Sequence, residues 1–509
     1  MKRFILLALA SMLVLSVGGF AVPAGATHPG VSHSNMDLLF SSPNATGATN
    51  SDLAFWGKYA YAGNYNGFRI FDISTTPPTL VSTFPCDGPQ NDVSVWDRDG
   101  NGLADILFMS VDAVMEGPAC GSARHNPPTG GPPYHPGDWE GIRIIDVSNP
   151  AAPFQIGNIY QDCGSHTHTL VPDPDDNRVL LYNASYPLRL GPTCGPGQAA
   201  DPLLSRIQVS EVSWNPGAPL NNAMLVSGEI AEPPISYPGD SDNQFTPADH
   251  GAPAFNPIRA CHDIAVHMGA GLVGAACAEQ AQLWSLDPDT LLPDTANPLW
   301  VFDNTEDTDG PGGGDAAADF WHSATFTWDG KTVNFSDESF GEGCPPETNI
   351  TDPDASVQGP SDTGRTYFLD VSSGKLHSDF MIPRPDASAG SYCSTHQGNT
   401  VPMAGRDYLI QAWYTGGVDV IDFTSKKHPK EVAFFDFNGA GPSGSDNWAH
   451  YWYETGSPKA NTPFTTYGTD GVHTPASGRG FEQFLVTLKS SKRYGMDHLN
   501  PQTQEATLP

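Results

Sequence analysis

The sequence predicts an all-β protein, a single seven-bladed β-propeller with four-stranded blades. A phrase of alternating apolar and polar residues, with Asp-hydrophobic-Ser and a proline turn, occurs almost unchanged at residues 67–84 and 141–160. Weaker copies recur along the chain. Before each copy lies a pair of short apolar strands, often joined by a tight turn such as "WDGK" (328–331). Four strands in each of seven units favour a ring that closes on itself and leaves no long exposed sheet edge.

The repeated phrase supplies the third and fourth strands of each predicted blade. In chain order its copies lie at residues 67–84, 141–160, 205–230, 281–302, 365–382, 416–436 and 480–490. The last copy lacks a fourth strand, because the chain leaves it as a polar segment. The segment "NMDLLFSS" (35–42) precedes the first blade, and we expect it to complete the last blade and close the ring. The predicted propeller domain spans residues 27–490, and residues 491–509 form a polar C-terminal tail.

Residues 1–26 have the three parts of a secretory signal peptide. A charged start, "MKR", is followed by the apolar run "FILLALASMLVLSV" and by the small residues "AGA" before Thr27. No later stretch approaches the length of a membrane span. We therefore expect a secreted, extracellular protein without a membrane span.

The charge balance excludes some classes of partner. The chain has 24 Lys and Arg against 57 Asp and Glu, a formal net charge of −33. Such a surface repels nucleic acid and anionic membranes, whereas it suits cations and solubility. The remaining partners are a small-molecule substrate or an extracellular protein or glycan.

The repeated phrase resembles that of the LVIVD-repeat family, whose repeat reads hydrophobic-x-hydrophobic-Asp-hydrophobic-Ser-x-Pro. The likeness covers most of residues 50–490; it is sharp in "GFRIFDIS" and "GIRIIDVS" and degenerate in the third and seventh blades. The resemblance implies a secreted or surface propeller. It implies no particular activity, because the family is named for its repeat.

The innermost strands predict a metal site. Five of the seven begin with histidine, and the other two begin with Ser51 and Asn91; the histidines are His168, His262, His322, His396 and His450. Inner strands line the channel of a propeller, and their starts converge at one end, here called the upper mouth. Imidazole is the commonest metal ligand near neutral pH, so the cluster predicts iron, copper or zinc. The alternative is a set of structural polar residues at a wet channel mouth.

Carboxylates on the second strands extend this prediction. Glu279 and Glu338, with Asp337 beside the latter, return to the upper mouth and are expected to bind the metal or to orient the imidazoles. His166 is expected in a loop beside the site. The arrangement is similar to the four histidines that hold iron in carotenoid-cleaving oxygenases and to histidine-rich copper sites of methanethiol-oxidase propellers. No local motif of either family is present, so no reaction follows from the likeness.

Eight cysteines in an exported protein predict four disulfides. Within the propeller model we expect sequential pairs near the upper mouth: Cys86 with Cys120, Cys163 with Cys194, Cys261 with Cys277, and Cys344 with Cys393. Cysteine metal ligands are the weaker alternative.

The segment "DRDGNGLADI" (97–106) predicts a calcium loop on the opposite face. Its oxygen donors stand at alternate positions, namely Asp97, Asp99, Asn101, the Leu103 carbonyl and Asp105. The pattern lacks the closing Glu of an EF-hand and resembles the short calcium hairpins of integrin-type propellers. The alternative is a solvated Asp/Gly hairpin without an ion.

Three functions are consistent with the sequence. The first is a secreted metal-dependent oxidoreductase whose ion is held by the histidines. The second is a non-catalytic propeller that binds an extracellular protein or glycan. The third is a hydrolase or lyase that uses the histidines as acid and base; the sequence contains no Gly-x-Ser-x-Gly or His-Glu-x-x-His motif to support it.

Overall fold

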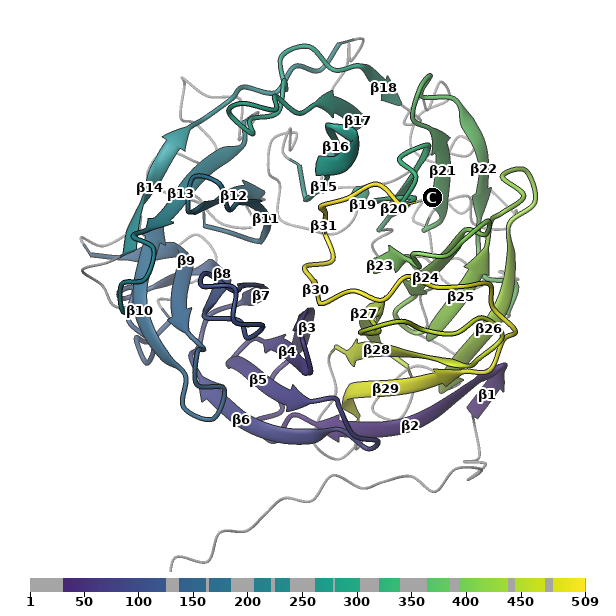
Figure 1. Cartoon of the computed structure of the whole chain (residues 1–509), viewed down its shortest axis with the longest axis horizontal. Coiled ribbons are helices and arrows are strands. Elements are labelled where there is room, and N and C mark those ends of the chain that lie inside the picture. The colour runs from purple at the N-terminus through teal and green to yellow at the C-terminus, as the bar shows by residue number, and fades with distance from the viewer. Residues whose placement is uncertain are drawn as a thin grey trace, which may run out of the picture.

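The structure, a computed structural model, is an arrangement of β-sheets in a ring around a common axis (Figure 1). It describes residues 31–508 except for 125–136, 162–163, 185–205, 221–224, 239–260, 278–279, 303–319, 339–363, 385–392, 438–444 and 472–478. The predicted signal peptide lies outside the described residues. Within them the only helix is a single 3-10 turn, η1 (Met268–Ala270), and none is long and apolar enough to cross a membrane. The all-β propeller class is confirmed.

Five sheets contain one antiparallel run of four consecutive strands each. The first comprises β3 (Asn50–Trp56), β4 (Tyr59–Asn64), β5 (Gly67–Asp72) and β6 (Thr79–Pro85), and the second β7 (Gln90–Trp96), β8 (Ile106–Met115), β9 (Trp139–Asp146) and β10 (Phe154–Tyr160). The third comprises β11 (Thr167–Asp173), β12 (Arg178–Ala184), β13 (Gln208–Trp214) and β14 (Leu225–Ala231). The fourth comprises β15 (Asp263–His267), β16 (Leu272–Cys277), β17 (Gln280–Ser285) and β18 (Trp300–Phe302). The fifth comprises β19 (Trp321–Phe326), β20 (Thr332–Asp337), β21 (Thr366–Asp370) and β22 (Leu376–Phe380).

A nine-stranded sheet completes the ring. One half contains β23 (Gln397–Thr400), β24 (Tyr408–Ala412), β25 (Val418–Asp422) and β26 (Lys430–Phe437), with β1 (Val31–Ser34) at its outer edge. The other half contains β27 (Asn447–Trp452), β28 (Phe464–Asp470), β29 (Gly480–Val486) and β2 (Met36–Pro43). The two halves are joined by a short parallel pairing of β23 with β27. The predicted count of seven blades rests on dividing the sheet at this pair.

The N-terminal strand β2 takes the place of the missing outer strand, as the sequence predicts. It pairs antiparallel with β29, from Met36 opposite Val486 to Pro43 opposite Gly480. Its buried Phe40 packs edge-on against Phe71 of the first sheet and Phe481 of β29. The first and last parts of the ring therefore share one apolar core, which is the requirement for a closed ring.

Glycine at the start of the repeated phrase has a steric cause. A Cβ atom on Gly67 or Gly141 would lie 1.9 or 2.2 Å from a carbonyl oxygen of the adjoining outer strand, and both residues have positive φ. Gly480 is under the same constraint, because its Cβ would lie 2.3 Å from the Ser42 carbonyl oxygen of β2. Only glycine permits so close an approach of two backbones. The contact at Ser42 also shows that β2 occupies the position of a regular fourth strand.

The C-terminal segment is part of the ring. β30 (His498–Leu499) pairs with β3, and β31 (Thr503–Gln504) pairs with β15. Between them the Asn500 side chain bonds both the N–H and the C=O of Val95, and Figure 1 shows this segment crossing the centre. These contacts lie at the far ends of the inner strands. The predicted polar tail therefore crosses the lower mouth, opposite the histidines.

Candidate metal centre at the upper mouth

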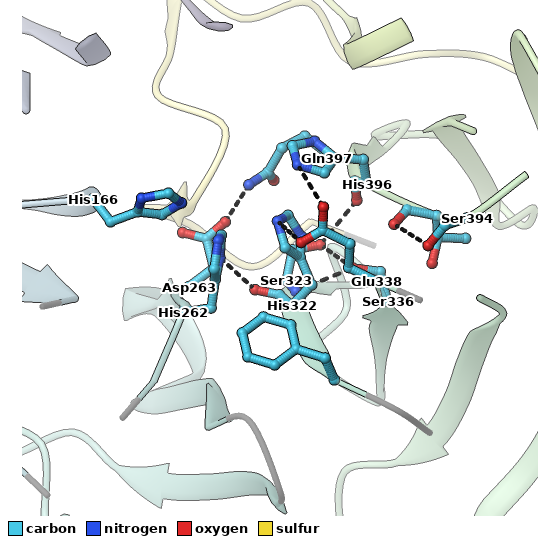
Figure 2. Close-up of polar contacts among 12 residues, drawn as sticks. His166, His262, Asp263, His322, Ser323, Ser336, Glu338, Ser394, His396 and Gln397 are labelled. Carbon is cyan, nitrogen blue, oxygen red and sulfur yellow. Dashed lines mark hydrogen bonds and ion pairs between the residues drawn. The ribbon is translucent and has the colours of Figure 1, made fainter. Parts of the chain in front are cut away.

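Four imidazoles follow one another around the upper mouth. The ring centroid of His166 lies 4.6 Å from that of His262, which lies 3.9 Å from that of His322, which lies 4.1 Å from that of His396. His166, His262 and His396 each come directly before an inner strand, and His322 is the second residue of β19. All four side chains are buried. Figure 2 shows them together with Glu338. Strand starts from four separate sheets thus converge as predicted, with His166 as a member.

Glu338 lies between two of the histidines. It follows β20 directly, and its Oε2 lies 3.5 Å from His322 Nε2, while its Oε1 lies 3.9 Å from His396 Nε2. One ligand atom from each of His262, His322 and Glu338 falls in a group whose members are all within 4.8 Å of one another. Burial raises the pKa of Glu338 to about 7. These three side chains can reach one ion.

Hydrogen bonds fix the orientation of two of these rings. His396 Nδ1 donates to the Trp448 carbonyl oxygen at 2.6 Å, and His262 Nδ1 donates to the His322 carbonyl oxygen at 3.1 Å. A backbone carbonyl on Nδ1 is a common partner of a metal-binding histidine, because it leaves the lone pair on Nε2. Both rings therefore present the nitrogen that a metal needs.

His166 is held in a different way. Its Nδ1 lies 2.7 Å from Asp112 Oδ2, and its Nε2 lies 3.0 Å from the Gln90 amide nitrogen. Because that amide donates to Nε2, the lone pair is already engaged. This arrangement agrees with the predicted place beside the site rather than on the ion.

His322 differs from the other histidines of the cluster in its hydrogen bonding. Its side chain is fully buried, and neither ring nitrogen has a hydrogen-bond partner within the described part of the chain. A buried polar group without a partner is unfavourable, and such groups in native proteins call for an explanation such as an absent ion. Burial, with the neighbouring imidazoles, holds the pKa of His262 and His322 well below the usual value, and burial lowers the pKa of His396 to about 3. These three imidazoles are therefore neutral at pH 7, which is the form that binds metal.

His168 does not join the cluster. Its Nε2 lies 2.7 Å from Ser94 Oγ and its Nδ1 lies 2.7 Å from Ser110 Oγ, while Asp92 is 3.2 Å away. The ring faces the second sheet, and hydroxyls of that sheet contact both of its nitrogens. β11 begins at Thr167, one residue before the predicted start, and His166, directly before the strand, occupies the position expected of His168.

His450 also lies away from the cluster. It is inside β27, with Nε2 2.7 Å from Thr466 Oγ1 and its ring 5.3 Å from that of Phe484. Burial within the blade lowers its pKa to about 3. The expected fifth ligand is therefore a core residue in the structure.

His450→Gln is expected to make the protein more tolerant of acid. The folded-state pKa lies below the ordinary value of about 6.5, so the unfolded chain binds one more proton between these two values. Stability from the neutral ring is complete above pH 6.5 and is lost as the pH falls, by on the order of 3 kcal/mol at pH 4. Urea unfolding at pH 7 and pH 4 should show a smaller loss in the variant than in the wild type. The exposed His428→Gln serves as control, and equal losses in all three proteins would contradict the prediction.

The other two predicted carboxylates, Glu279 and Asp337, are not among the ligand atoms grouped within the described residues. Glu279 lies outside the described residues. Asp337 accepts the backbone N–H groups of Phe320 and Gly364, at 2.8 and 2.7 Å, and so anchors two segments beside the cluster.

Two predicted disulfides are present, Cys86–Cys120 and Cys261–Cys277. The second joins the residue before His262 to the end of β16 and thereby fixes the start of β15. Cys393 is also disulfide-bonded, but its predicted partner Cys344, like Cys163 and Cys194, lies outside the described residues.

The hairpin between β7 and β8 brings together three of the predicted calcium donors. One carboxylate oxygen from each of Asp97, Asp99 and Asp105 lies within 4.8 Å of the others. Asp97 accepts the N–H groups of residues 100 and 102 at 2.8 and 2.7 Å, and Asn101 Oδ1 accepts that of Leu103 at 2.9 Å. Burial and the neighbouring carboxylates raise the pKa of Asp105 to about 6. Calcium binding there stays a prediction.

Sequence reasoning did not find Tyr414 and Trp448. The Tyr414 hydroxyl lies 2.5 Å from Glu338 Oε1, and the ring centroids of Tyr414 and Trp448 lie 4.7 and 4.6 Å from that of His396. Neither residue belongs to a recognisable motif; the turn "WYTGG" (413–417) after β24 was the available signal.

Comparisons with known proteins identify the repeated phrase. No curated protein matches the sequence. Among solved structures, the crystal structure of the Myceliophteria thermophila Cps50 (Swd1) beta-propeller domain is similar, with 9% identity, 89% of this chain and 100% of that chain covered, and a TM-score of 0.44. The LVIVD repeat model matches residues 47–84 and 137–160, which contain the two sharp copies of the phrase. The chain therefore contains at least two segments that are similar to LVIVD repeats.

Proposed function

We propose that this propeller binds one transition-metal ion at the upper mouth, with His262, His322, His396 and Glu338 as ligands. The observation that supports the proposal most strongly is the buried imidazole of His322. It has no hydrogen-bond partner in the described structure, and its ligand atom belongs to one compact group with those of His262 and Glu338. A bound ion would give one of its two ring nitrogens a partner.

The donor set favours a borderline metal. Three imidazoles and one carboxylate suit zinc, copper or iron, whereas calcium and magnesium prefer oxygen ligands. Because burial raises the pKa of Glu338 to about 7, a bound cation would stabilise its ionised form and displace a proton below that pH. Metal affinity is therefore expected to rise with pH up to about 7.

The identity of the metal ion decides which activity we propose. Copper or iron would make the protein a secreted oxidoreductase, and the disulfides fit an oxidising compartment. The alternative is a non-catalytic propeller that binds an extracellular protein or glycan; it would stand if the cluster held no metal. We also propose a structural calcium ion in the β7–β8 hairpin, supported by the three grouped carboxylates.

Elemental analysis of the purified full-length protein tests the proposal. We expect about one transition-metal ion per chain in the wild type and less than about a tenth of that in His262→Asn/His396→Asn, because two of four ligands are lost. The matched control His377→Asn/His428→Asn removes two histidines that lie outside the cluster and should keep the ion. Calcium measured in the same samples should fall only in Asp99→Asn/Asp105→Asn. A double histidine variant with wild-type metal content, or a wild type that takes up no zinc or copper, would overturn the proposed site.

A further inference from the structure

Tyr414 stands in a backbone conformation that tyrosine rarely adopts. Its φ is 44°, in the left-handed region that favours glycine and asparagine, although two glycines follow within the same turn. The turn is held to β27 by reciprocal backbone hydrogen bonds between Tyr414 and Asn447, at 3.2 and 3.0 Å. Disfavoured conformations of this kind cluster at functional sites, where the surrounding structure maintains them. The disfavoured conformation therefore suggests that the Tyr414 side chain has a role at this position.

That side chain contacts two proposed ligands at once. Its hydroxyl donates to Glu338 Oε1 at 2.5 Å, and its ring packs against His396 with centroids 4.7 Å apart. The Trp448 ring also packs against this imidazole, with its centroid 6.2 Å from that of Tyr414, and the Trp448 carbonyl accepts from His396 Nδ1. Tyr414 thus bridges the carboxylate and one imidazole of the cluster.

The two oxygens of Glu338 have different surroundings. Oε1 accepts the Tyr414 hydroxyl and lies 3.9 Å from His396 Nε2, while Oε2 accepts no hydroxyl of the described residues and lies 3.5 Å from His322 Nε2. A strong hydrogen bond to one carboxylate oxygen fixes the rotation of the group and lowers the availability of that oxygen to a cation. Oε2 is then the oxygen turned toward the ion.

We propose that Tyr414 is a positioning residue of the metal centre: its hydroxyl holds Glu338 so that the carboxylate binds the ion through Oε2 alone. This inference rests on the proposed function, because it assigns a role toward the same ion. A purely structural tyrosine would act through ring packing on His396 and Trp448. Tyr414→Phe preserves that packing and removes only the hydroxyl, so it separates the two roles.

Cobalt(II) bound to the full-length protein gives the readout, since its visible absorption reports the number and geometry of ligands. We expect Tyr414→Phe to bind Co²⁺ about 10- to 100-fold more weakly than the wild type, which is the usual effect of losing a partner of a metal ligand. Its visible bands should shift as Glu338 becomes free to use both oxygens. The control Tyr467→Phe removes a buried hydroxyl that contacts Gln483 in β29 and should leave affinity and bands unchanged.

The outcomes distinguish the two proposals. If the wild type binds no Co²⁺, both the metal centre and the role of Tyr414 are wrong. If the wild type binds Co²⁺ and Tyr414→Phe has the same affinity and the same bands, only the positioning role is wrong. Tyr414→Gly, which suits the left-handed turn, removes the ring as well as the hydroxyl; weakening and a band shift in this variant but not in Tyr414→Phe would assign the effect to ring packing and overturn the positioning role.

Discussion

A chain that begins at residue 44, without β1 and β2, is expected not to form the closed ring. Seven residues of β2 are paired with β29, and Met36 and Phe40 are almost completely buried. Loss of two large apolar side chains costs about 1.5–3 kcal/mol each, and each lost backbone hydrogen bond adds about 0.5–1.5 kcal/mol. The sum approaches the whole stability of a typical domain, about 5–15 kcal/mol. The deletion would also leave β29 as an unpaired edge that favours aggregation.

Single substitutions in β2 are expected to lower the stability by different amounts. Phe40→Ala should lower the free energy of unfolding by about 3–5 kcal/mol, because it empties the space between Phe71 and Phe481. Asp37→Ala changes an exposed residue of the same strand and should have an effect below about 0.5 kcal/mol. Thermal unfolding and light scattering of the three proteins provide the measurement. A shortened chain that is soluble and melts at the wild-type temperature would show that β2 does not close the ring.

His322→Leu is expected to abolish metal binding and at the same time to stabilise the metal-free protein. The imidazole is fully buried, and neither of its nitrogens has a hydrogen-bond partner in the described residues. Such a group costs about 1–3 kcal/mol, and an apolar side chain of similar size removes that cost. The gain would identify the histidine as one kept for binding at the expense of stability.

His168→Leu supplies the opposite case. The nitrogens of His168 contact Ser94 and Ser110, so the substitution would leave two buried hydroxyls without that partner and should destabilise the fold. Denaturant unfolding of chelator-treated proteins should move the midpoint up for His322→Leu and down for His168→Leu, whereas only the former should lose the metal. Destabilisation by His322→Leu would mean that the ring has a structural role in the metal-free protein.

The sequence predicted the fold more completely than the site because the repeat is a local signal. The alternating strands and the position of residues 35–42 follow from backbone geometry that one blade repeats in the next. His262, His322 and Glu338 were found in the same way, by their position relative to strand ends. The choice between His166 and His168 could not be made, since residues two apart share a face of a strand and the register depends on Ser94 and Ser110 of a neighbouring sheet. Tyr414 was beyond prediction, because its role depends on a turn that brings it to a carboxylate 76 positions away.

The pairing of early strands with late ones has a consequence for folding. β2 must wait for β29, and β3 and β15 must wait for β30 and β31, which lie much later in the sequence. Pairings between such distant residues form slowly, and until they form the nascent polypeptide has open edges. A polypeptide of this design therefore has no closed ring until its first and last strands have paired.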